Sequence, residues 1–376
     1  MRIIHVVPFY YPVIGGVEEV AKRIAEYIAS RGYEVYAVTY NRTRIGGVGS
    51  LPREETIDGV HVVRLKPDIM WSHGTYSSEL PEIFRKLRPD IIHVHAWRHP
   101  HVFQIAKLKK KLHFKTVLHG HAPFYKFKQL GMIIWLYHKA VDLFMRNVLK
   151  EYDELIALTP YEKNILVKKL DVDEEKVTVV PNGIDDKLVS SVHNIKILEA
   201  NTVLYLGRIS KEKNLNLLIQ SMVYVKKEIP DVKLMLAGPD EGLIAELRRY
   251  ALKHHIDLKY FGPVTEENKY ELYSLGSIYA NPSLYEGFGL TLLEAQAFGK
   301  PCVITGDGGQ LYAAPPRKTS LYAKPNPKDF AKAIVTLLTD KTIYKKLSVN
   351  ARVWASRHLW SKILPLYEKI YGKLYE

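Results

Sequence analysis

The chain has 376 residues, which predicts two domains of common size, and its 47% hydrophobic content is ordinary for a protein that buries a core. Its one cysteine, Cys302, excludes an internal disulfide and a zinc site built from cysteines. The apolar runs fall short of the roughly 20 residues that cross a bilayer, and the opening run is too short for a secretory signal. We therefore expect a cytoplasmic protein.

Strands and helices alternate along the first half of the chain. The predicted strands are Arg2–Pro8, Glu34–Tyr40, His61–Leu65, Asp90–His95, Lys115–His119, Glu154–Thr159 and Lys176–Val180. Between the first two strands, apolar residues recur at the spacing of one helical face, which predicts a helix from Glu18 to Ser30. Helices are expected in most of the other gaps.

The alternation stops at the turn sequence Pro181–Asp185 and restarts after a polar stretch that ends at Asn201. The predicted strands of the second half are Val203–Leu206, Lys233–Ala237, Leu258–Phe261, Ile278–Asn281 and Cys302–Thr305. The predicted helices are Asn214–Glu228, Glu241–His254, Glu266–Leu275, Pro327–Thr339, Thr342–Arg357 and Trp360–Tyr371.

This alternation predicts an α/β protein whose parallel sheets are covered by helices on both faces. We expect two doubly wound, Rossmann-like domains facing a central cleft, with residues 1–185 in the first and residues 186–358 in the second. Residues 359–376 are expected to form a terminal helix. Because ligands bind at the carboxyl ends of the strands in such sheets, residues at strand ends are the candidate site.

The segment from Glu286 to Glu294 is the most informative part of the chain. Its two carboxylates lie eight residues apart and bracket Gly287 and Gly289, after which a helix is predicted. Glycines let backbone N–H groups approach phosphate oxygens, and a helix N-terminus carries a partial positive charge. This pattern suits a sugar linked through a diphosphate to a nucleotide. The alternative is an ordinary loop residue and an ordinary exposed helix residue.

Two cations follow the first strand of the second half. Arg208 comes at the end of that strand, and Lys213 lies just before the next helix. Together they can hold a pyrophosphate and stabilise the negative charge that develops on it as it leaves. In the first half, Gly15 and Gly16 follow the first strand, where a backbone N–H can reach a phosphate.

Several histidines end strands in the first half. His119 can hydrogen-bond an acceptor hydroxyl or the transferred sugar, and it is a better candidate than His95, with His121 behind both. The spacing of His93 and His95 occurs in metal sites, but no carboxylate pattern accompanies them. We read Asp171-Val-Asp173 as a solvated loop at a helix end, so no metal site is expected.

Together these motifs resemble glycosyltransferase family 4, the group 1 glycosyl transferases, along nearly the whole chain. The segments that carry the resemblance are Gly15-Gly16, Pro89–His95, Val180–Asp185, Gly207–Asn214 and Glu286–Glu294. Enzymes of this family have the GT-B fold and retain the configuration of the transferred sugar. One departure is Gln310, which ends the run Thr305–Gln310 where family members often carry Pro-Glu.

The resemblance implies a hexosyltransferase that uses a UDP-, GDP- or ADP-sugar, without a cofactor or a divalent metal. By it, Arg208 and Lys213 hold the diphosphate, Glu286 the donor sugar and Glu294 the ribose, while His119 lies near the transferred sugar and the acceptor. The backbone groups that approach the phosphates closely are those of Gly15, Gly16, Gly289, Leu290 and Thr291. The first domain binds the acceptor, the second binds the donor, and the last helix crosses back to the first domain.

The net charge of +14 is unevenly placed, with eleven Lys and Arg against one acid between Arg98 and Lys150. Within this region, Phe124–Val148 combines basic with apolar residues, as an interfacial helix does. The basic residues are Lys126, Lys128, Lys139 and Arg146, and the apolar ones are Phe124, Phe127, Met132, Ile133, Ile134, Trp135, Leu136 and Phe144. Either this segment binds an anionic membrane, or its apolar residues belong to the core and its lysines are solvent-exposed at the margin of that core.

The leading hypothesis is an enzyme at the inner face of the cell membrane that glycosylates a lipid-linked or phospholipid acceptor. A transferase that makes a small glycoside or a glycan, and a sugar phosphorylase on the same fold, stay open as alternatives. A nucleic-acid-binding protein is suggested only by the charge, and since no binding module accompanies it, nucleic acid is not an expected partner.

Overall fold

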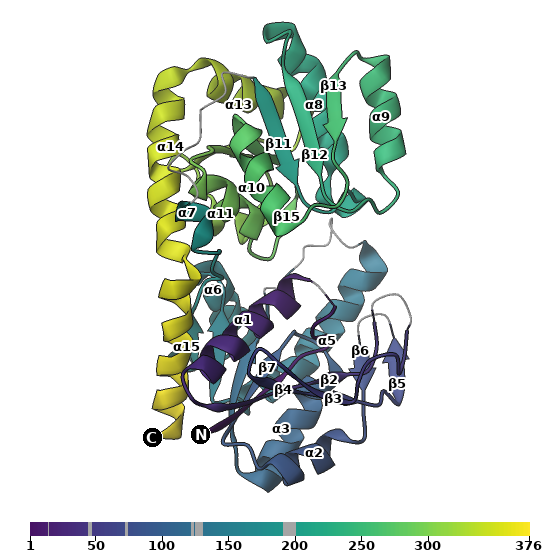
Figure 1. Cartoon of the computed structure of the whole chain (residues 1–376), viewed down its shortest axis with the longest axis vertical. Helices are drawn as coiled ribbons and strands as arrows, with labels where there is room; N and C mark the ends of the chain where they lie inside the picture. Colours follow the sequence, from purple (N-terminus) through teal and green to yellow (C-terminus); the bar gives the residue numbers. More distant parts are fainter. Residues whose placement is uncertain (14, 44–46, 72–73, 122–123, 125–130, 191–200) are drawn as a thin grey trace. The chain divides into compact units, whose positions relative to one another are not determined.

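The structure is a computed structural model, and it describes all of the chain except residues 14, 44–46, 72–73, 122–123, 125–130 and 191–200 (Figure 1). The chain forms two compact units. Unit 1 consists of Met1–Pro181 and Ile363–Glu376, and unit 2 of Asn182–Lys362. The sequence pattern had placed the first boundary after residue 185 and the second after residue 358.

Unit 1 is built on an eight-stranded sheet with the order β10-β9-β8-β7-β1-β2-β4-β3. The strands are β1 (Arg2–Val6), β2 (Glu34–Tyr40), β3 (Glu54–Ile57), β4 (Val60–Leu65), β7 (Ile91–His95), β8 (Lys115–His119), β9 (Glu154–Ala157) and β10 (Val177–Val179). All neighbours run parallel except β3 and β4, and β5 (Ile69–Trp71) forms a separate hairpin with β6 (Gly74–Tyr76). The parallel arrangement predicted from the sequence is confirmed.

The antiparallel edge strand β3 was not predicted. Asp58 and Gly59 join it to β4 with backbone φ angles of 48° and 81°, a combination typical of tight two-residue hairpin turns. The Asp-Gly pair was the signal for this hairpin. The short, half-exposed strand Glu54–Ile57 was too weakly patterned to stand out beside the buried parallel strands.

Helices cover both faces of the unit 1 sheet. They are α1 (Gly16–Ser30), α2 (Leu80–Leu87), α3 (Pro100–Leu112), α5 (Met132–Lys150), α6 (Pro160–Leu170) and α15 (Trp360–Tyr375). One core packs alternate strand residues such as Ile4 and Val94 against α2, α3, α5 and α6. On the opposite face, Tyr367 and Tyr371 of α15 pack against strand histidines, and Tyr27 of α1 donates a hydrogen bond of 3.2 Å to Glu368.

Unit 2 has a six-stranded sheet, all parallel, with the order β13-β12-β11-β14-β16-β18. The strands are β11 (Thr202–Leu206), β12 (Lys233–Ala237), β13 (Asp257–Tyr260), β14 (Ile278–Asn281), β16 (Cys302–Ile304) and β18 (Ser320–Tyr322). Two short strands, β15 (Tyr285–Glu286) and β17 (Asp307–Gly308), pair beside this sheet. The five strands predicted from the sequence are confirmed.

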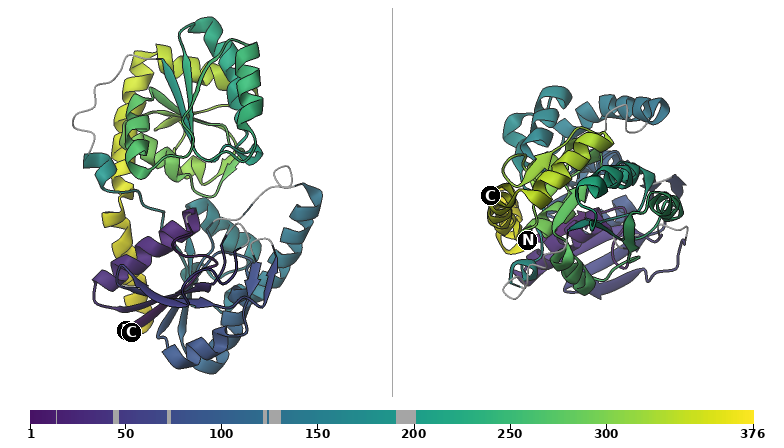
Figure 2. Two further views of the ribbon diagram at one scale, coloured as in Figure 1. Left: turned by 45° about the vertical axis from the view of Figure 1, so that its right-hand side comes forward. Right: turned by 90° about the horizontal axis from the view of Figure 1, so that it is seen from above.

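Helices lie on both sides of the unit 2 strands (Figure 2). They are α7 (Lys187–Ser190), α8 (Leu215–Glu228), α9 (Ile244–Lys253), α10 (Glu266–Leu275), α11 (Leu290–Ala297), α12 (Gln310–Ala313), α13 (Pro327–Thr339) and α14 (Lys341–Ala355). Each unit is therefore a doubly wound, Rossmann-like α/β structure.

In each sheet the strand order reverses at one place. In unit 2 the chain builds outward from β11 in one direction through β12 and β13, and from β14 in the other through β16 and β18. In unit 1 the corresponding place lies between β1 and β7. Open α/β sheets bind ligands where such a reversal leaves a crevice at the carboxyl ends of the strands. The candidate residues follow these strands.

Candidate functional site

An ion pair joins the two loops at the strand reversal of unit 2. Lys213 follows β11 and Glu286 follows β14, and the Lys213 Nζ lies 2.8 Å from both carboxylate oxygens of Glu286. Both side chains are largely buried, at 21% and 16% exposed. The two residues are 73 positions apart in the chain. The structure thus brings together two residues that were predicted separately.

A second hydrogen bond ties the same two loops together. The Asn214 side-chain amide donates to the Pro282 carbonyl oxygen at 3.0 Å. Asn214 has a φ of 54°, in the left-handed region that asparagine tolerates, and it precedes the first residue of α8. This contact fixes the ends of β11 and β14 relative to each other and so positions Lys213 and Glu286.

Arg208 lies at the same sheet edge but binds other partners. Its guanidinium donates to the Glu241 carboxylate at 2.8 and 3.1 Å and to Glu212 at 3.2 Å. Burial acts to lower the pKa of Arg208, but these carboxylates outweigh it and raise the pKa. The side chain is 47% exposed. Arg208 is therefore a charged group held in place, with part of its surface open to a ligand.

Glu294 is not the ordinary exposed helix residue of the alternative interpretation. It is the fifth residue of α11, its side chain is 14% exposed, and it accepts hydrogen bonds from the Tyr273 hydroxyl at 2.6 Å and from the Lys269 Nζ at 3.2 Å. Burial, followed by the nearby charge of Glu294, raises the pKa of Tyr273, which keeps this hydroxyl protonated as a donor. The carboxylate is positioned by residues of α10.

The α11 helix begins directly after Gly289, where the sequence pattern predicted a helix start. Gly289 precedes the helix with a φ of 98°, and a Cβ there would lie 2.9 Å from the Leu292 side chain. The Tyr279 hydroxyl donates its one hydrogen to the Leu206 carbonyl at 2.8 Å, so the hydroxyl of Thr291 in the first turn donates to the Tyr279 oxygen at 2.9 Å. The backbone N–H groups of Leu290 and Thr291 belong to the helix N-terminus, where anions are stabilised.

The glycine run after β16 packs against the backbone of the loop that carries Glu286. Glu286 of β15 aligns with Gly308 of β17, and a Cβ on Gly309 would lie 2.2 Å from the Gly287 carbonyl oxygen. Gln310, where the sequence departs from the family pattern, is buried and donates to the Ser283 and Asp307 carbonyls at 3.0 and 3.1 Å. Gln310 therefore holds the two loops together.

In unit 1, His119 ends β8 and is fully buried, beside His95 at the end of β7. The next residue, Gly120, is packed so tightly that a Cβ would lie 2.9 Å from the Trp97 ring. Gly15 and Gly16 lie at the N-terminus of α1, with Gly15 in an extended conformation. The role of these residues toward a ligand stays a prediction.

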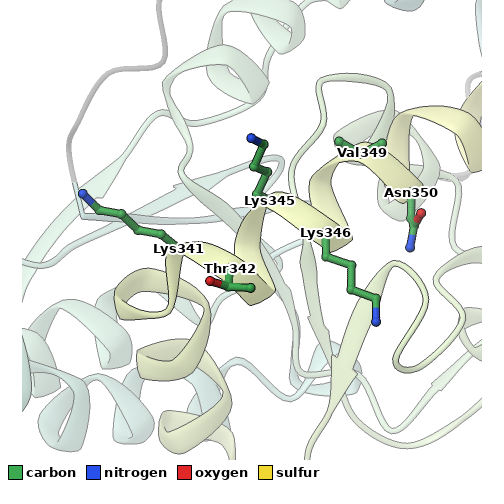
Figure 3. Close-up of a pocket in the computed structure, with 6 residues that line it drawn as sticks. All are labelled: Lys341, Thr342, Lys345, Lys346, Val349 and Asn350. Atoms are coloured by element: carbon green, nitrogen blue, oxygen red, sulfur yellow. The ribbon is translucent and has the colours of Figure 1, made fainter.

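Two other charged groups have local structural roles. Asp171 ends α6 and binds the Lys150 Nζ at 2.7 Å, and Asp173 caps the short 3-10 helix that follows. A shallow hollow on α14 is lined by residues that include Lys341, Lys345 and Lys346, and Figure 3 shows these side chains pointing in different directions. Neither group forms a convergent set of ligands.

The α5 helix exposes much of its apolar surface. Phe144 is 71% exposed and Leu143 65%, and Met132, Ile134 and Leu136 are also exposed. The interpretation of Met132, Ile134, Leu136 and Phe144 as core is therefore wrong, whereas Lys126, Lys128 and Phe127 lie outside the described residues.

Next to α5 lies a cavity of about 1020 Å³ whose lining includes Phe103, Tyr137 and Phe144 together with Lys107 and Lys110. Among the described residues, no helix has both the length and the hydropathy needed to cross a membrane.

The sequence matches known glycosyltransferase families over almost the whole chain. Residues 14–188 match the model of Glycosyltransferase Family 4, and residues 191–354 match that of the glycosyl transferases group 1. The chain is 26% identical to an uncharacterized glycosyltransferase of Methanocaldococcus jannaschii, over 93% of this chain and 92% of that protein.

The chain is 24% identical to a phosphatidylinositol N-acetylglucosaminyltransferase subunit of Arabidopsis thaliana, over 99% of this chain and 82% of that one. In fold it is similar to the Anabaena protein HepE, solved in complex with UDP and glucose. That similarity has a TM-score of 0.74 at 18% identity and covers 99% of this chain and 100% of HepE.

Proposed function

The chain belongs to the group 1 glycosyl transferases of glycosyltransferase family 4, with the GT-B fold, and from this premise we propose that it moves a sugar from a nucleotide-diphosphate sugar to an acceptor hydroxyl with retention and without a catalytic metal. The observation that carries the proposal is the Lys213–Glu286 pair at the strand reversal of unit 2, beside the N-terminus of α11. A cation, a carboxylate and a helix N-terminus meet there, as a sugar diphosphate requires.

In this proposal each residue has one task. Lys213 and Arg208 bind the diphosphate and stabilise the charge that develops on the leaving phosphate. When the diphosphate attracts Lys213, the carboxylate of Glu286 becomes available to accept hydrogen bonds from the sugar hydroxyls. Glu294, held by Tyr273 and Lys269, accepts from the ribose hydroxyls.

The N-terminus of α11 supplies the backbone donors at Gly289, Leu290 and Thr291 for the phosphates, and Gly15 and Gly16 supply further ones from unit 1. The acceptor hydroxyl attacks on the face that the diphosphate leaves, and the leaving phosphate takes its proton. This step assigns no protein side chain as a covalent nucleophile. His119 is proposed to contact the transferred sugar and the acceptor.

The donor site is tested by thermal stabilisation of the protein with UDP-, GDP- and ADP-sugars, each with and without a chelator. We expect one donor class to raise the unfolding temperature of unit 2, with no effect of the chelator. If no donor stabilises the protein, the proposal is wrong. If only inorganic phosphate does so, the protein is a sugar phosphorylase on the same fold.

The first prediction concerns Lys213. Lys213→Ala is expected to lower turnover by about 10²–10³-fold, because one preorganised group that stabilises transition-state charge is lost. The measurement is steady-state kinetics with the donor identified above. Lys211→Ala is the matched control, since it removes a lysine from the same short 3-10 helix, two residues before the lysine that binds Glu286, and should leave turnover unchanged. Equal turnover in both variants contradicts the assignment.

For the acceptor we propose a lipid with an anionic head group, met at an anionic membrane surface. Three features support it: the exposed apolar side chains of α5, the neighbouring cavity that combines aromatic side chains with lysines, and the lipid in the name of the Arabidopsis relative. Apolar side chains enter the interface while each nearby lysine or arginine adds about 1 kcal/mol of attraction to anionic lipid.

The second prediction tests this surface. Leu143→Ser and Phe144→Ser together are expected to weaken binding to phosphatidylserine-containing vesicles by about tenfold or more, since about 1.5–3 kcal/mol of burial is lost for each large side chain. Vesicle co-sedimentation at physiological salt measures it. Leu252→Ser on α9 is the control, because Leu252 is 78% exposed but lies in unit 2. Undiminished binding by the double variant would favour a glycoside- or glycan-forming transferase.

A further inference from the structure

Histidines gather on one face of the unit 1 sheet. β1, β7 and β8 are adjacent parallel strands in which His5 aligns with His93 and His95 with His119. Because side chains alternate between the faces of a strand, this register places all four on one side of the sheet, where they are fully buried. His121 is partly exposed, and its ring stacks on that of His119 with the centroids 3.9 Å apart.

Three of these histidines have converging ligand atoms. One ring nitrogen each of His95, His119 and His121 lies within 4.8 Å of the others. His95 Nδ1 and His121 Nε2 are 3.2 Å apart. Two imidazole nitrogens bound at 2.0–2.1 Å to one tetrahedral zinc ion stand about 3.3 Å apart, so this pair already has the spacing of two zinc ligands.

His119 supplies an independent indication of a ligand. Both of its ring nitrogens are buried, and neither has a hydrogen-bond partner among the described residues. Leaving a buried polar atom without a partner costs about 1–3 kcal/mol, so such atoms in native proteins usually face a water, an ion or a ligand. A bound metal ion would satisfy one of these nitrogens.

The second ring nitrogen of His95 has a hydrogen-bond partner, which is the imidazole of His5. His95 Nε2 lies 3.0 Å from His5 Nδ1, and a proton on Nε2 leaves the Nδ1 lone pair of His95 facing His121.

We propose that His95, His119 and His121 bind one Zn²⁺ ion. The ligand set is three neutral nitrogens without a carboxylate or a thiolate, which suits zinc and excludes the hard ions Mg²⁺ and Ca²⁺, since these need oxygen ligands. Three histidines leave one tetrahedral position open for water or an anion. The partly exposed His121 provides the route by which the ion enters.

A second group of three histidines lies deeper and is the weaker site. His5, His93 and His95 also have ligand atoms within 4.8 Å of one another, but all three side chains are fully buried. The Nδ1 of His93 is already engaged by the Tyr371 hydroxyl at 2.6 Å. We therefore assign the ion to the group that contains His121.

The consequence of zinc binding rests on the proposed function. If His119 contacts the sugar and the acceptor, an ion bound to its ring nitrogen removes that contact and inhibits transfer. Zinc would then be a reversible inhibitor of an enzyme that needs no metal. The binding itself does not depend on the proposed function, so the two claims can fail separately.

Calorimetric titration of untagged, chelator-treated full-length protein with Zn²⁺ tests the binding. We expect one equivalent to bind and Mg²⁺ to give no signal. His121→Asn should weaken Zn²⁺ binding by at least about 100-fold, since losing even a second-sphere partner costs 10–100-fold. Asparagine suits this position because His121 has a φ of 59°, so the backbone is kept while the ligand is removed.

His113→Asn is the matched control, because His113 is an exposed histidine of unit 1 with a φ of 53°. It should bind Zn²⁺ like the unaltered protein. The proposal is overturned if the unaltered protein binds no Zn²⁺, if His121→Asn binds as tightly as before, or if His113→Asn loses binding equally. Inhibition is measured separately, as loss of sugar transfer with Zn²⁺ that a chelator reverses. Zinc binding without inhibition contradicts only the consequence.

Discussion

At the scale of residues, five buried or nearly buried histidines make the stability of unit 1 depend on pH. Burial is the first cause of the lowered pKa of His5, His93, His95, His119 and His121, and the pKa of His5 and His121 falls to about 3. The ordinary histidine pKa is about 6.5, so below that value the unfolded chain binds protons that the folded unit does not. Stability is therefore complete above about pH 6.5 and is lost as the pH falls toward 3.

The third prediction follows from this linkage. Between pH 7.5 and 5.5 each of these histidines should cost unit 1 roughly 1.4 kcal/mol of unfolding free energy, the value of one pH unit of differential proton binding. Hydrogen exchange resolved by peptide measures it, with β7 and β8 of unit 1 compared with β11 and β14 of unit 2. Equal protection of β7 and β8 at the two pH values would contradict it.

At the scale of elements, the proposed donor site depends on short strands and tight backbone approaches rather than on long helices. The pairing of β15 with β17 carries Glu286, and it requires the backbone of Gly309 to lie against that of Gly287. Gly309 has an ordinary φ of −62°, so what it needs from glycine is the missing Cβ, not an unusual conformation. The glycine run is thus a packing requirement of the site.

Gly309→Ala is the fourth prediction. Its Cβ would lie 2.2 Å from the Gly287 carbonyl oxygen and 2.4 Å from the Phe288 Cα, and backbone atoms cannot move aside without shifting Glu286. A displacement of about 1 Å can cost on the order of 100-fold in turnover, which steady-state kinetics would detect. Gly372→Ala is the control, because a Cβ there meets nothing within 4 Å. Retained turnover in Gly309→Ala, with the circular dichroism spectrum unchanged, would argue against this role.

At the scale of the whole molecule, the last part of the chain completes the first unit. Residues from Ile363 onward belong to unit 1, and Tyr367 and Tyr371 are buried against the strand histidines. Tyr27 of α1 and Arg31, which directly follows that helix, both donate hydrogen bonds to Glu368 of the same segment. A sheet face that carries four histidines is therefore covered by residues from a segment far away in the sequence.

The fifth prediction is that a chain ending at Lys362 retains unit 2 and destabilises unit 1. Each large side chain lost from a buried position removes about 1.5–3 kcal/mol, and six such residues are absent, namely Ile363, Leu364, Tyr367, Ile370, Tyr371 and Leu374. Calorimetry should show a lower transition for unit 1, while the donor still stabilises unit 2. A chain ending at Leu374, which lacks only the terminal Tyr375 and Glu376, is the control. Unchanged protection of β7 and β8 in the shorter chain would contradict this prediction.

Local patterns predicted the two α/β halves, most strand positions and the residues that follow the strands. The Glu286–Glu294 segment and the Arg208–Lys213 loop were recognisable because glycines, charges and a helix start lie within a few residues of one another. The pairing of Lys213 with Glu286 was not predictable, since it joins residues 73 apart and depends on β11 lying beside β14. Tyr273, which donates to Glu294, was missed because that contact depends on α10 lying beside α11.

By itself, therefore, the sequence determined the fold class, the family and the identity of the candidate residues, because these depend on periodicity and on short motifs. The tertiary structure decided what depends on strand order and on which faces are covered. His5 was not a candidate until β1 was found beside β7, and the apolar residues of α5 could not be separated from core until their exposure was known. The physical reason is that burial and contact are properties of neighbours in space, and a chain pattern records only neighbours in sequence.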